Sequence, residues 1–140
     1  MARESLVLDA SVVVKWFTQE ENRKEALKMR EMFINGEVEI ICPDLILYEL
    51  SNALRFNPNF SAEDVQNAIE SIINIEIDIT FPISSTLNKA IELSFSKNIT
   101  LYDSFYAALA IELNCNFVTA DEKLYNKLKD VCDVVMLRDY

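Results

Sequence analysis

The chain has 140 residues, of which 51% are hydrophobic, and this length and composition predict one domain spanning residues 1–140 with a substantial core. Its formal net charge of −10 argues against general nucleic-acid binding, because contacts to phosphates need Lys and Arg side chains. The sequence contains no His and a single Gly, which excludes a Ser-His-Asp triad, a histidine-pair ribonuclease, a P-loop and a dinucleotide-binding glycine fingerprint.

Apolar patterns and turn residues divide the first half of the chain into alternating strands and helices. In chain order they predict a strand at 6–8, a helical turn at 11–17, a helix with apolar residues over 26–33, a strand at 38–42 and a helix from 43 to about 55. Gly36 should end the helix that precedes it, as glycine commonly does. Pro43 suits the first turn of the last helix, where its missing N–H has no partner to lose.

The second half continues the same alternation. It predicts a helix from residue 61, a strand at 75–79, helices at about 85–96 and 101–114, a strand at 116–119, a helix at 121–129 and a strand at 134–137. Ser61 and Asp64 have the spacing of a capping box, which marks a helix start. Apolar and acidic residues alternate from Ile75 to Ile79, so this strand should have one wet face and lie at or near a sheet edge.

Strands separated by helices predict an α/β fold, a three-layer α/β/α sandwich around a largely parallel sheet of about five strands. In such sheets, ligands bind beyond the carboxyl ends of the strands. Asp9 follows the first predicted strand directly, and Asp121 follows the strand at 116–119. Both also have ordinary explanations, since Asp9 suits a helix N-cap and Asp121 could begin a helix that Thr119 caps.

Two further acids lie in predicted helices that are otherwise apolar. The face that carries Glu49 also carries Ile46, Leu50 and Ala53. Glu49 should therefore point inward, although it could reach solvent from the margin of that face. Asp103 lies in the first turn of a helix, where an acid is favoured, yet this helix is apolar nearly all round and should be buried. Acids gathered in such settings need a counter-charge, and a divalent cation is the natural one.

The cysteines and the lengths of the apolar stretches indicate the cellular compartment of the protein. Cys42, Cys115 and Cys132 are widely spaced in apolar surroundings, which indicates reduced core residues and not a zinc site. No apolar stretch approaches the ~20 residues of a membrane span, and the N-terminal residues do not form a signal peptide. We therefore expect a cytoplasmic protein with no membrane association.

Four segments around these acids resemble the PIN domain, and particularly the VapC-type toxins of bacterial and archaeal toxin–antitoxin pairs. They are Leu8-Asp9-Ala10-Ser11 with Val14-Lys15 just after it, Tyr48-Glu49-Leu50-Ser51-Asn52-Ala53-Leu54, Leu101-Tyr102-Asp103-Ser104-Phe105-Tyr106-Ala107-Ala108-Leu109-Ala110, and Phe117-Val118-Thr119-Ala120-Asp121. The similarity spans essentially the whole chain, with the segments in the family's order. One departure is Ser104, where the family more often has a small apolar residue.

The resemblance implies a metal-dependent ribonuclease with a toxin's role. By position, the catalytic and metal-binding set would be Asp9, Glu49, Asp103 and Asp121, with Ser11, Asn52 and Thr119 as polar supports and Lys15 as a contact to the substrate phosphate. Oxygen ligands of this kind suit Mg²⁺ or Mn²⁺. The resemblance also implies an RNA substrate, a homodimer and an antitoxin partner, for which a basic segment would suit the acidic surface.

Other classes of protein also place acids at strand ends. A phosphotransferase of the haloacid-dehalogenase type usually has a second Asp two residues after the first, where this chain has Ser11. A receiver domain needs an Asp at the end of its third strand, whereas Asp78 lies inside an alternating strand. Both are therefore disfavoured. The alternative to an enzyme is a non-catalytic PIN-like module that binds RNA or a protein, and the preference for RNA over DNA rests on the family resemblance alone.

Overall fold

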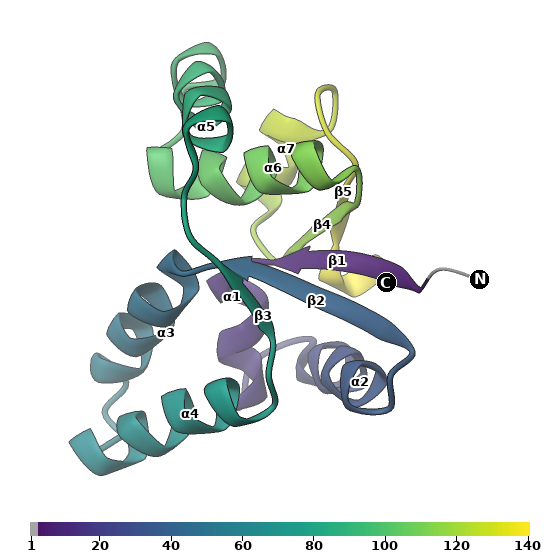
Figure 1. Ribbon diagram of the computed structural model, residues 1–140. Coiled ribbons are helices and arrows are strands. Elements are labelled where there is room, and N and C mark those ends of the chain that lie inside the picture. Colours follow the sequence, from purple (N-terminus) through teal and green to yellow (C-terminus); the bar gives the residue numbers. More distant parts are fainter. Residues whose placement is uncertain (1–2) are drawn as a thin grey trace.

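Residues 3–140, described by a computed structural model, contain a five-stranded parallel sheet with the order β3-β2-β1-β4-β5 (Figure 1). The strands are β1 (Glu4–Leu8), β2 (Val38–Pro43), β3 (Asp78–Thr80), β4 (Asn116–Thr119) and β5 (Val134–Met136). The helices are α1 (Ala10–Val13), α2 (Arg23–Ile34), α3 (Leu45–Arg55), α4 (Ala62–Asn74), α5 (Ser84–Lys97), α6 (Leu101–Leu113) and α7 (Glu122–Leu128), with short 3₁₀ segments at η1 (Val14–Trp16) and η2 (Leu137–Asp139). The predicted α/β architecture is confirmed.

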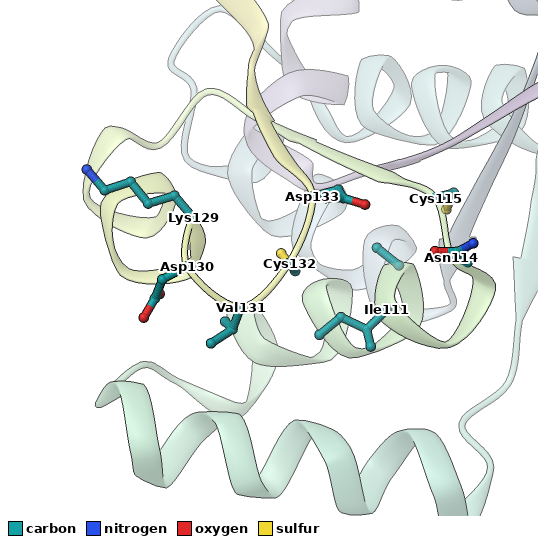
Figure 2. A pocket seen from close by; sticks show the side chains of 9 residues that line it. Ile111, Asn114, Cys115, Lys129, Asp130, Val131, Cys132 and Asp133 are labelled. Atoms are coloured by element: carbon teal, nitrogen blue, oxygen red, sulfur yellow. The ribbon is translucent and has the colours of Figure 1, made fainter.

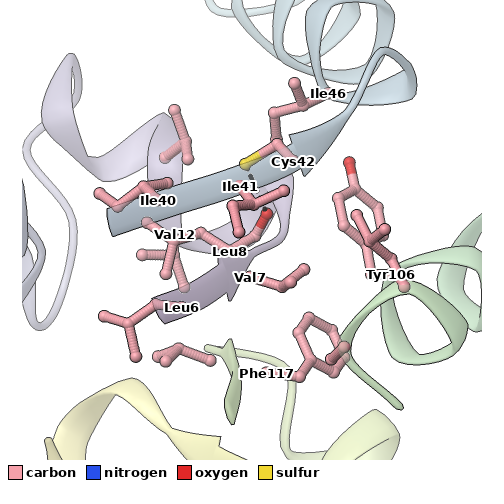
Figure 3. Close-up of a cluster of buried hydrophobic side chains, with 14 of the residues drawn as sticks. Leu6, Val7, Leu8, Val12, Ile40, Ile41, Cys42, Ile46, Tyr106 and Phe117 are labelled. Atoms are coloured by element: carbon pink, nitrogen blue, oxygen red, sulfur yellow. Dashed lines mark hydrogen bonds between the residues drawn. The ribbon is translucent and has the colours of Figure 1, made fainter. Parts of the chain in front are cut away.

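Helices cover both faces of the sheet. The helix α6 packs against β1, β2 and β4 and carries α5 on its outer side, while α2, α3 and α4 lie on the opposite side (Figure 1). Side chains alternate along β1, so Val7 faces Tyr106 and Phe117, whereas Leu6 lies on the side of Val12 (Figure 3). The sheet therefore has a buried apolar layer on each face, which explains why its central strands are continuous apolar runs.

Two predictions in the β2–β3 region were wrong in their bounds. Pro43 ends β2 and pairs with Thr80 of β3, and the helix begins only at Leu45. At the end of a strand, the missing N–H of proline is as harmless as in a first helical turn. The strand predicted at 75–79 is Asp78–Thr80, because Ile75 caps α4 and Glu76 has a φ of 61°, which turns the chain. Its edge position was predicted correctly.

Three smaller expectations have clear outcomes. The capping box of Ser61 and Asp64 is present at the start of α4. Gly36 follows α2 with a φ of 77°, a conformation that glycine adopts without strain. Ser104 is fully buried, and its hydroxyl donates to the Ala90 carbonyl of α5 over 2.7 Å, so a polar residue is satisfied inside this helix pair.

The cysteines and the membrane prediction can also be compared with the structure. All three cysteines are free, and Cys42 is buried with its thiol 3.3 Å from the Leu8 carbonyl oxygen. Cys115 and Cys132 are half-buried. Within residues 3–140, no helix combines the length and the apolar character needed to cross a membrane.

Candidate active site

Asp9 lies at the carboxyl end of β1, where the chain enters α1. It occupies the N-cap position, but its side chain makes no capping hydrogen bond, so capping does not explain this acid. Instead, its two oxygens accept hydrogen bonds from two hydroxyl groups. Ser11 Oγ donates to Oδ1 over 2.5 Å, and Thr119 Oγ1 donates to Oδ2 over 2.6 Å. Only 6% of Asp9 is exposed, so its carboxylate is held in place below the surface.

Backbone groups fix the direction of both hydroxyl protons. Ser11 Oγ accepts from the Ala120 N–H over 2.9 Å, and Thr119 Oγ1 accepts from the Asp121 N–H over 3.1 Å. Each hydroxyl therefore accepts one hydrogen bond from a backbone N–H just after β4 and donates one to Asp9. The network joins the carboxyl ends of β1 and β4, which are neighbours in the sheet.

Within residues 3–140, no Lys or Arg side chain forms an ion pair with Asp9. Burial raises the pKa of Asp9 from 3.8 to about 6, the hydrogen bonds from Ser11 and Thr119 oppose this rise, and the charge of Asp103 adds to it. Among the ion pairs of residues 3–140, none includes Asp9, Glu49, Asp103 or Asp121. An ionised Asp9 is thus energetically costly in this setting.

Glu49 lies on α3 at the margin of its buried stripe. That stripe consists of Ile46, Leu50 and Leu54, whereas Ala53 is exposed, so the predicted inward face was wrong for Ala53. Glu49 is half-buried, and its Oε1 accepts a hydrogen bond of 2.6 Å from the Tyr106 hydroxyl. Burial raises the pKa of Glu49, the bond from Tyr106 opposes the rise, and the charge of Asp103 adds to it.

Asp103 and Asp121 begin α6 and α7. The Asp103 N–H donates to Thr100 Oγ1 over 3.1 Å, but the Asp103 carboxylate does not complete a capping box. Burial, followed by the charge of Asp121, raises the pKa of the half-buried Asp103. Asp121 is exposed and is itself the N-cap of α7, since its Oδ1 accepts from the Leu124 N–H over 3.2 Å. The alternative in which Thr119 caps this helix was therefore wrong.

The four acids at the carboxyl end of the sheet interact through their charges. Asp103 raises the pKa of both Asp9 and Glu49, and Asp121 raises the pKa of Asp103. In the part of the chain that the structure describes, however, no three or more Asp, Glu or Cys side chains are arranged to hold a metal ion. Three of the four carboxylates are turned towards their own hydrogen-bond donors. The donor set nevertheless fits a divalent cation, because it offers only oxygen ligands and lacks a neutralising charge.

The profile of the PIN domain family matches residues 6–129. The chain belongs to the PIN domain family. It is 25% identical over 126 residues to ribonuclease VapC3 of Pyrobaculum aerophilum, covering 87% of this chain and 93% of that protein. The fold is similar to that of VapBC2 from Rickettsia felis bound to promoter DNA, with a TM-score of 0.69, 15% identity and coverage of 94% and 96%. It is also similar to VapC20 of Mycobacterium tuberculosis, a toxin that cleaves the sarcin–ricin loop, with a TM-score of 0.67, 11% identity and coverage of 86% and 93%.

Asn52 and Lys15, which the PIN resemblance implies as site residues, form no side-chain hydrogen bond or ion pair with the four acids within residues 3–140. Asn52 is exposed, and its side chain takes part in none of the hydrogen bonds found within residues 3–140. Lys15 is buried, and its Nζ lies 3.7 Å from Glu20 Oε1. A contact between Lys15 and a substrate phosphate would require it to leave Glu20. Both roles stay predictions.

Tyr106 contacts Glu49, one of the four acids of this PIN domain, and the sequence alone did not single it out. It looked like one more apolar position in α6, yet its hydroxyl reaches Glu49 from another helix. Two signals could have found it. Tyr106 lies three residues after Asp103, so both share a helix face. A tyrosine in a fully apolar helix also needs a hydrogen-bond partner for its hydroxyl.

The pocket in Figure 2 lies away from the acids. Its cavity volume is about 300 Å³, and it lies between the end of α6 and the turn from α7 to β5. Cys115 and Asp133, which line it, directly precede β4 and β5, so the pocket is at the amino end of the parallel sheet. None of the predicted site residues lines it.

Proposed function

We propose that this PIN domain protein is an Mg²⁺- or Mn²⁺-dependent endoribonuclease and the toxin of a toxin–antitoxin pair. The observation that carries the proposal is Asp9, a buried carboxylate with both oxygens hydrogen-bonded and with no ion pair to a Lys or Arg of residues 3–140. The charge of Asp103 acts on Asp9 and on Glu49, and the charge of Asp121 acts on Asp103, so the three further acids lie in the same region. The relationship to a ribonuclease of the VapC type supports the same activity.

Asp9, Glu49, Asp103 and Asp121 are the residues that would hold the cation. When bound, it supplies the positive charge that attracts the scissile phosphate and stabilises the charge that develops during displacement. This also answers how a chain with a net charge of −10 can act on a nucleic acid, since the phosphate is met locally. Binding would leave Asp9 held by Ser11 and Thr119 and Glu49 Oε1 held by Tyr106, while the Asp103 carboxylate turns towards them.

The chain's own groups supply the rest of the chemistry. Asp103 and Asp121 are our candidates for the base that accepts a proton from the attacking water. The water oxygen bonds to phosphorus while the bond to the 3′ oxygen breaks. The products then carry 5′-phosphate and 3′-hydroxyl ends, and the 2′-hydroxyl takes no part.

Partners and location follow from the same proposal. An antitoxin would use a basic segment against the acidic surface, and could set an Arg or Lys among the four carboxylates in place of the cation. We also propose a homodimer and a cytoplasmic location, as in the family that the sequence resembles. An antitoxin encoded beside this chain that neither binds it nor suppresses its nuclease activity would contradict the toxin role.

RNA cleavage with Mg²⁺ or Mn²⁺, with and without chelator, tests the activity. Asp9→Asn and Asp103→Asn should each lower the cleavage rate by at least about 100-fold. That is the upper end of the loss of activity seen when a group that supports a metal ligand is removed, and these two acids are proposed ligands themselves. Glu4→Gln is the matched control, because Glu4 is an exposed acid at the opposite end of β1. Cleavage that survives both chelation and the two substitutions would overturn the proposal.

The second candidate is a non-catalytic PIN-like module that binds RNA or a protein. The observation in its favour is that no three acids of residues 3–140 are arranged around one point. A titration with Mn²⁺ separates the two candidates. An enzyme should bind Mn²⁺ through a site that Asp9→Asn removes, whereas a pure binding module should show no carboxylate-dependent site.

A further inference from the structure

The Tyr106 side chain reaches from α6 to α3. Only 1% of the residue is exposed, and its hydroxyl donates to Glu49 Oε1 over 2.6 Å. The bond joins side chains 57 residues apart in sequence. Burial and the neighbouring Glu49 carboxylate raise the pKa of Tyr106 far above its ordinary value, so the phenol stays protonated and acts only as a donor to this acid.

The tyrosine ring has little freedom to move. It stacks on Phe117 of β4 with a centroid separation of 6.1 Å and an interplanar angle of 4°. Phe117 is fully buried, and Figure 3 shows the two rings together beside Val7 of the central strand. A hydroxyl at the end of a ring packed in this way points in one direction.

Glu49, by contrast, has reasons to move. It is half-buried at the margin of the α3 stripe, and its long side chain has several rotatable bonds. Burial, and to a smaller extent the charge of Asp103, also disfavours its ionised form. Without a fixed donor, the Glu49 carboxylate would turn away from Asp103 and towards solvent.

Asp103 and Tyr106 are three residues apart on α6 and therefore share a face. One helix thus presents both an acid of the proposed site and the donor that holds a second acid from another helix. We propose that Tyr106 is a positioning residue, whose hydrogen bond keeps the Glu49 carboxylate beside Asp103 so that both can bind one divalent cation. This inference rests on the proposed function.

Mn²⁺ affinity of the whole chain, measured by titration calorimetry, tests this role without depending on cleavage. Tyr106→Phe keeps the ring and removes the donor, and should weaken Mn²⁺ binding by about 10-fold, as loss of a ligand's hydrogen-bond partner does in other metal sites. Tyr140→Phe is the matched control, since it removes a tyrosine–glutamate bond of 3.3 Å to Glu4 at the other end of the sheet. That variant should bind Mn²⁺ as the wild type does.

A double-mutant cycle separates positioning from a general structural role. If Tyr106 acts through Glu49, adding Tyr106→Phe to Glu49→Gln should cause no further loss of Mn²⁺ affinity. Fully additive losses, or a Tyr106→Phe variant with wild-type affinity, would overturn the inference. Wild-type protein that binds Mn²⁺ but cuts no RNA would sink only the proposed nuclease activity, whereas wild-type protein that binds no Mn²⁺ would overturn both proposals.

Discussion

Acidic residues at the two ends of the parallel sheet differ in their burial and in the groups that they contact. At the amino end, Glu39 is paired with Arg3 over 3.1 Å, and Glu4 accepts from Asn116 and Tyr140 near the surface. At the carboxyl end, Asp9 is buried among hydroxyl donors, and none of the ion pairs found within the described chain includes it. The same residue type is thus compensated at one end and left with an uncompensated charge at the other.

Exposed, paired acids and buried, unpaired acids differ in what their charges cost the protein. An exposed, paired carboxylate costs little and contributes little. A buried carboxylate without a cation lowers stability, and such groups with shifted pKa values gather at functional sites. The carboxyl end of the sheet is therefore where added charge or neutralisation should change the protein most.

Cation binding is one of the two largest expected effects at the carboxyl end. Mn²⁺ at about 100 times its dissociation constant should stabilise the wild type by about 2.7 kcal/mol, which raises the midpoint of thermal unfolding by roughly 5–10 °C. Thermal unfolding with and without Mn²⁺ measures this rise. Asp103→Asn should lose most of it and Glu4→Gln should keep it. Equal rises in both variants would show that the cation binds elsewhere.

Neutralising Asp9 should stabilise the chelated protein. Because the pKa of Asp9 is raised from 3.8 to about 6, the folded state holds an extra proton between these values, so stability falls as pH rises through this window. At pH 8 the full cost is present. Asp9→Asn should then be more stable by about 3 kcal/mol, since the rise from 3.8 to about 6 corresponds to about 1.4 kcal/mol for each pH unit.

Urea unfolding of the chelated protein at several pH values between 4 and 8 checks this. The advantage of Asp9→Asn should grow from pH 4 to pH 6 and then level off. The amide can accept from one of the hydroxyls of Ser11 and Thr119 and donate to the other, so the network need not collapse. Glu4→Gln, which changes an exposed acid in the same way, should show no such growth. A constant difference at all pH values would contradict the burial cost.

The sequence predicts most of the fold because apolar patterns and helix signals were strong and local. The errors at Pro43 and at the start of β3 arose where two local explanations fit equally well. Proline suits both a first helical turn and a strand end, and the alternation of Ile75 to Ile79 could not reveal that Glu76 adopts a positive φ. Ala53 was misplaced because helical spacing alone does not fix the centre of a buried stripe.

The candidate site also combines residues that the local sequence predicts with contacts that depend on tertiary structure. Each acid could be named from its neighbours in sequence, and Ser11 and Thr119 from the resemblance. The partner that each acid meets depends on tertiary structure, so the sequence could indicate that the Tyr106 hydroxyl needs a partner but not that this partner is Glu49. The exposed position of Asn52 and the pairing of Lys15 with Glu20 likewise depend on how whole helices pack.

The amino end supplies the smallest effect. The side chains of Arg3 and Glu39 are 52% and 47% exposed, so water already solvates both charges. Glu39→Gln should lower the free energy of unfolding by less than about 1 kcal/mol, and the difference should shrink in high salt, which screens exposed charges. The amide oxygen can still accept from Ser5, whose hydroxyl lies 3.3 Å from the Glu39 carboxylate.

Urea unfolding at low and high salt measures this effect, and RNA cleavage by Glu39→Gln should equal that of the wild type. A loss as large as the gain expected for Asp9→Asn would mean that the amino end depends on its charges too. The contrast between the two ends would then reflect local packing, and the uncompensated charge of Asp9 would no longer mark the carboxyl end as the functional one.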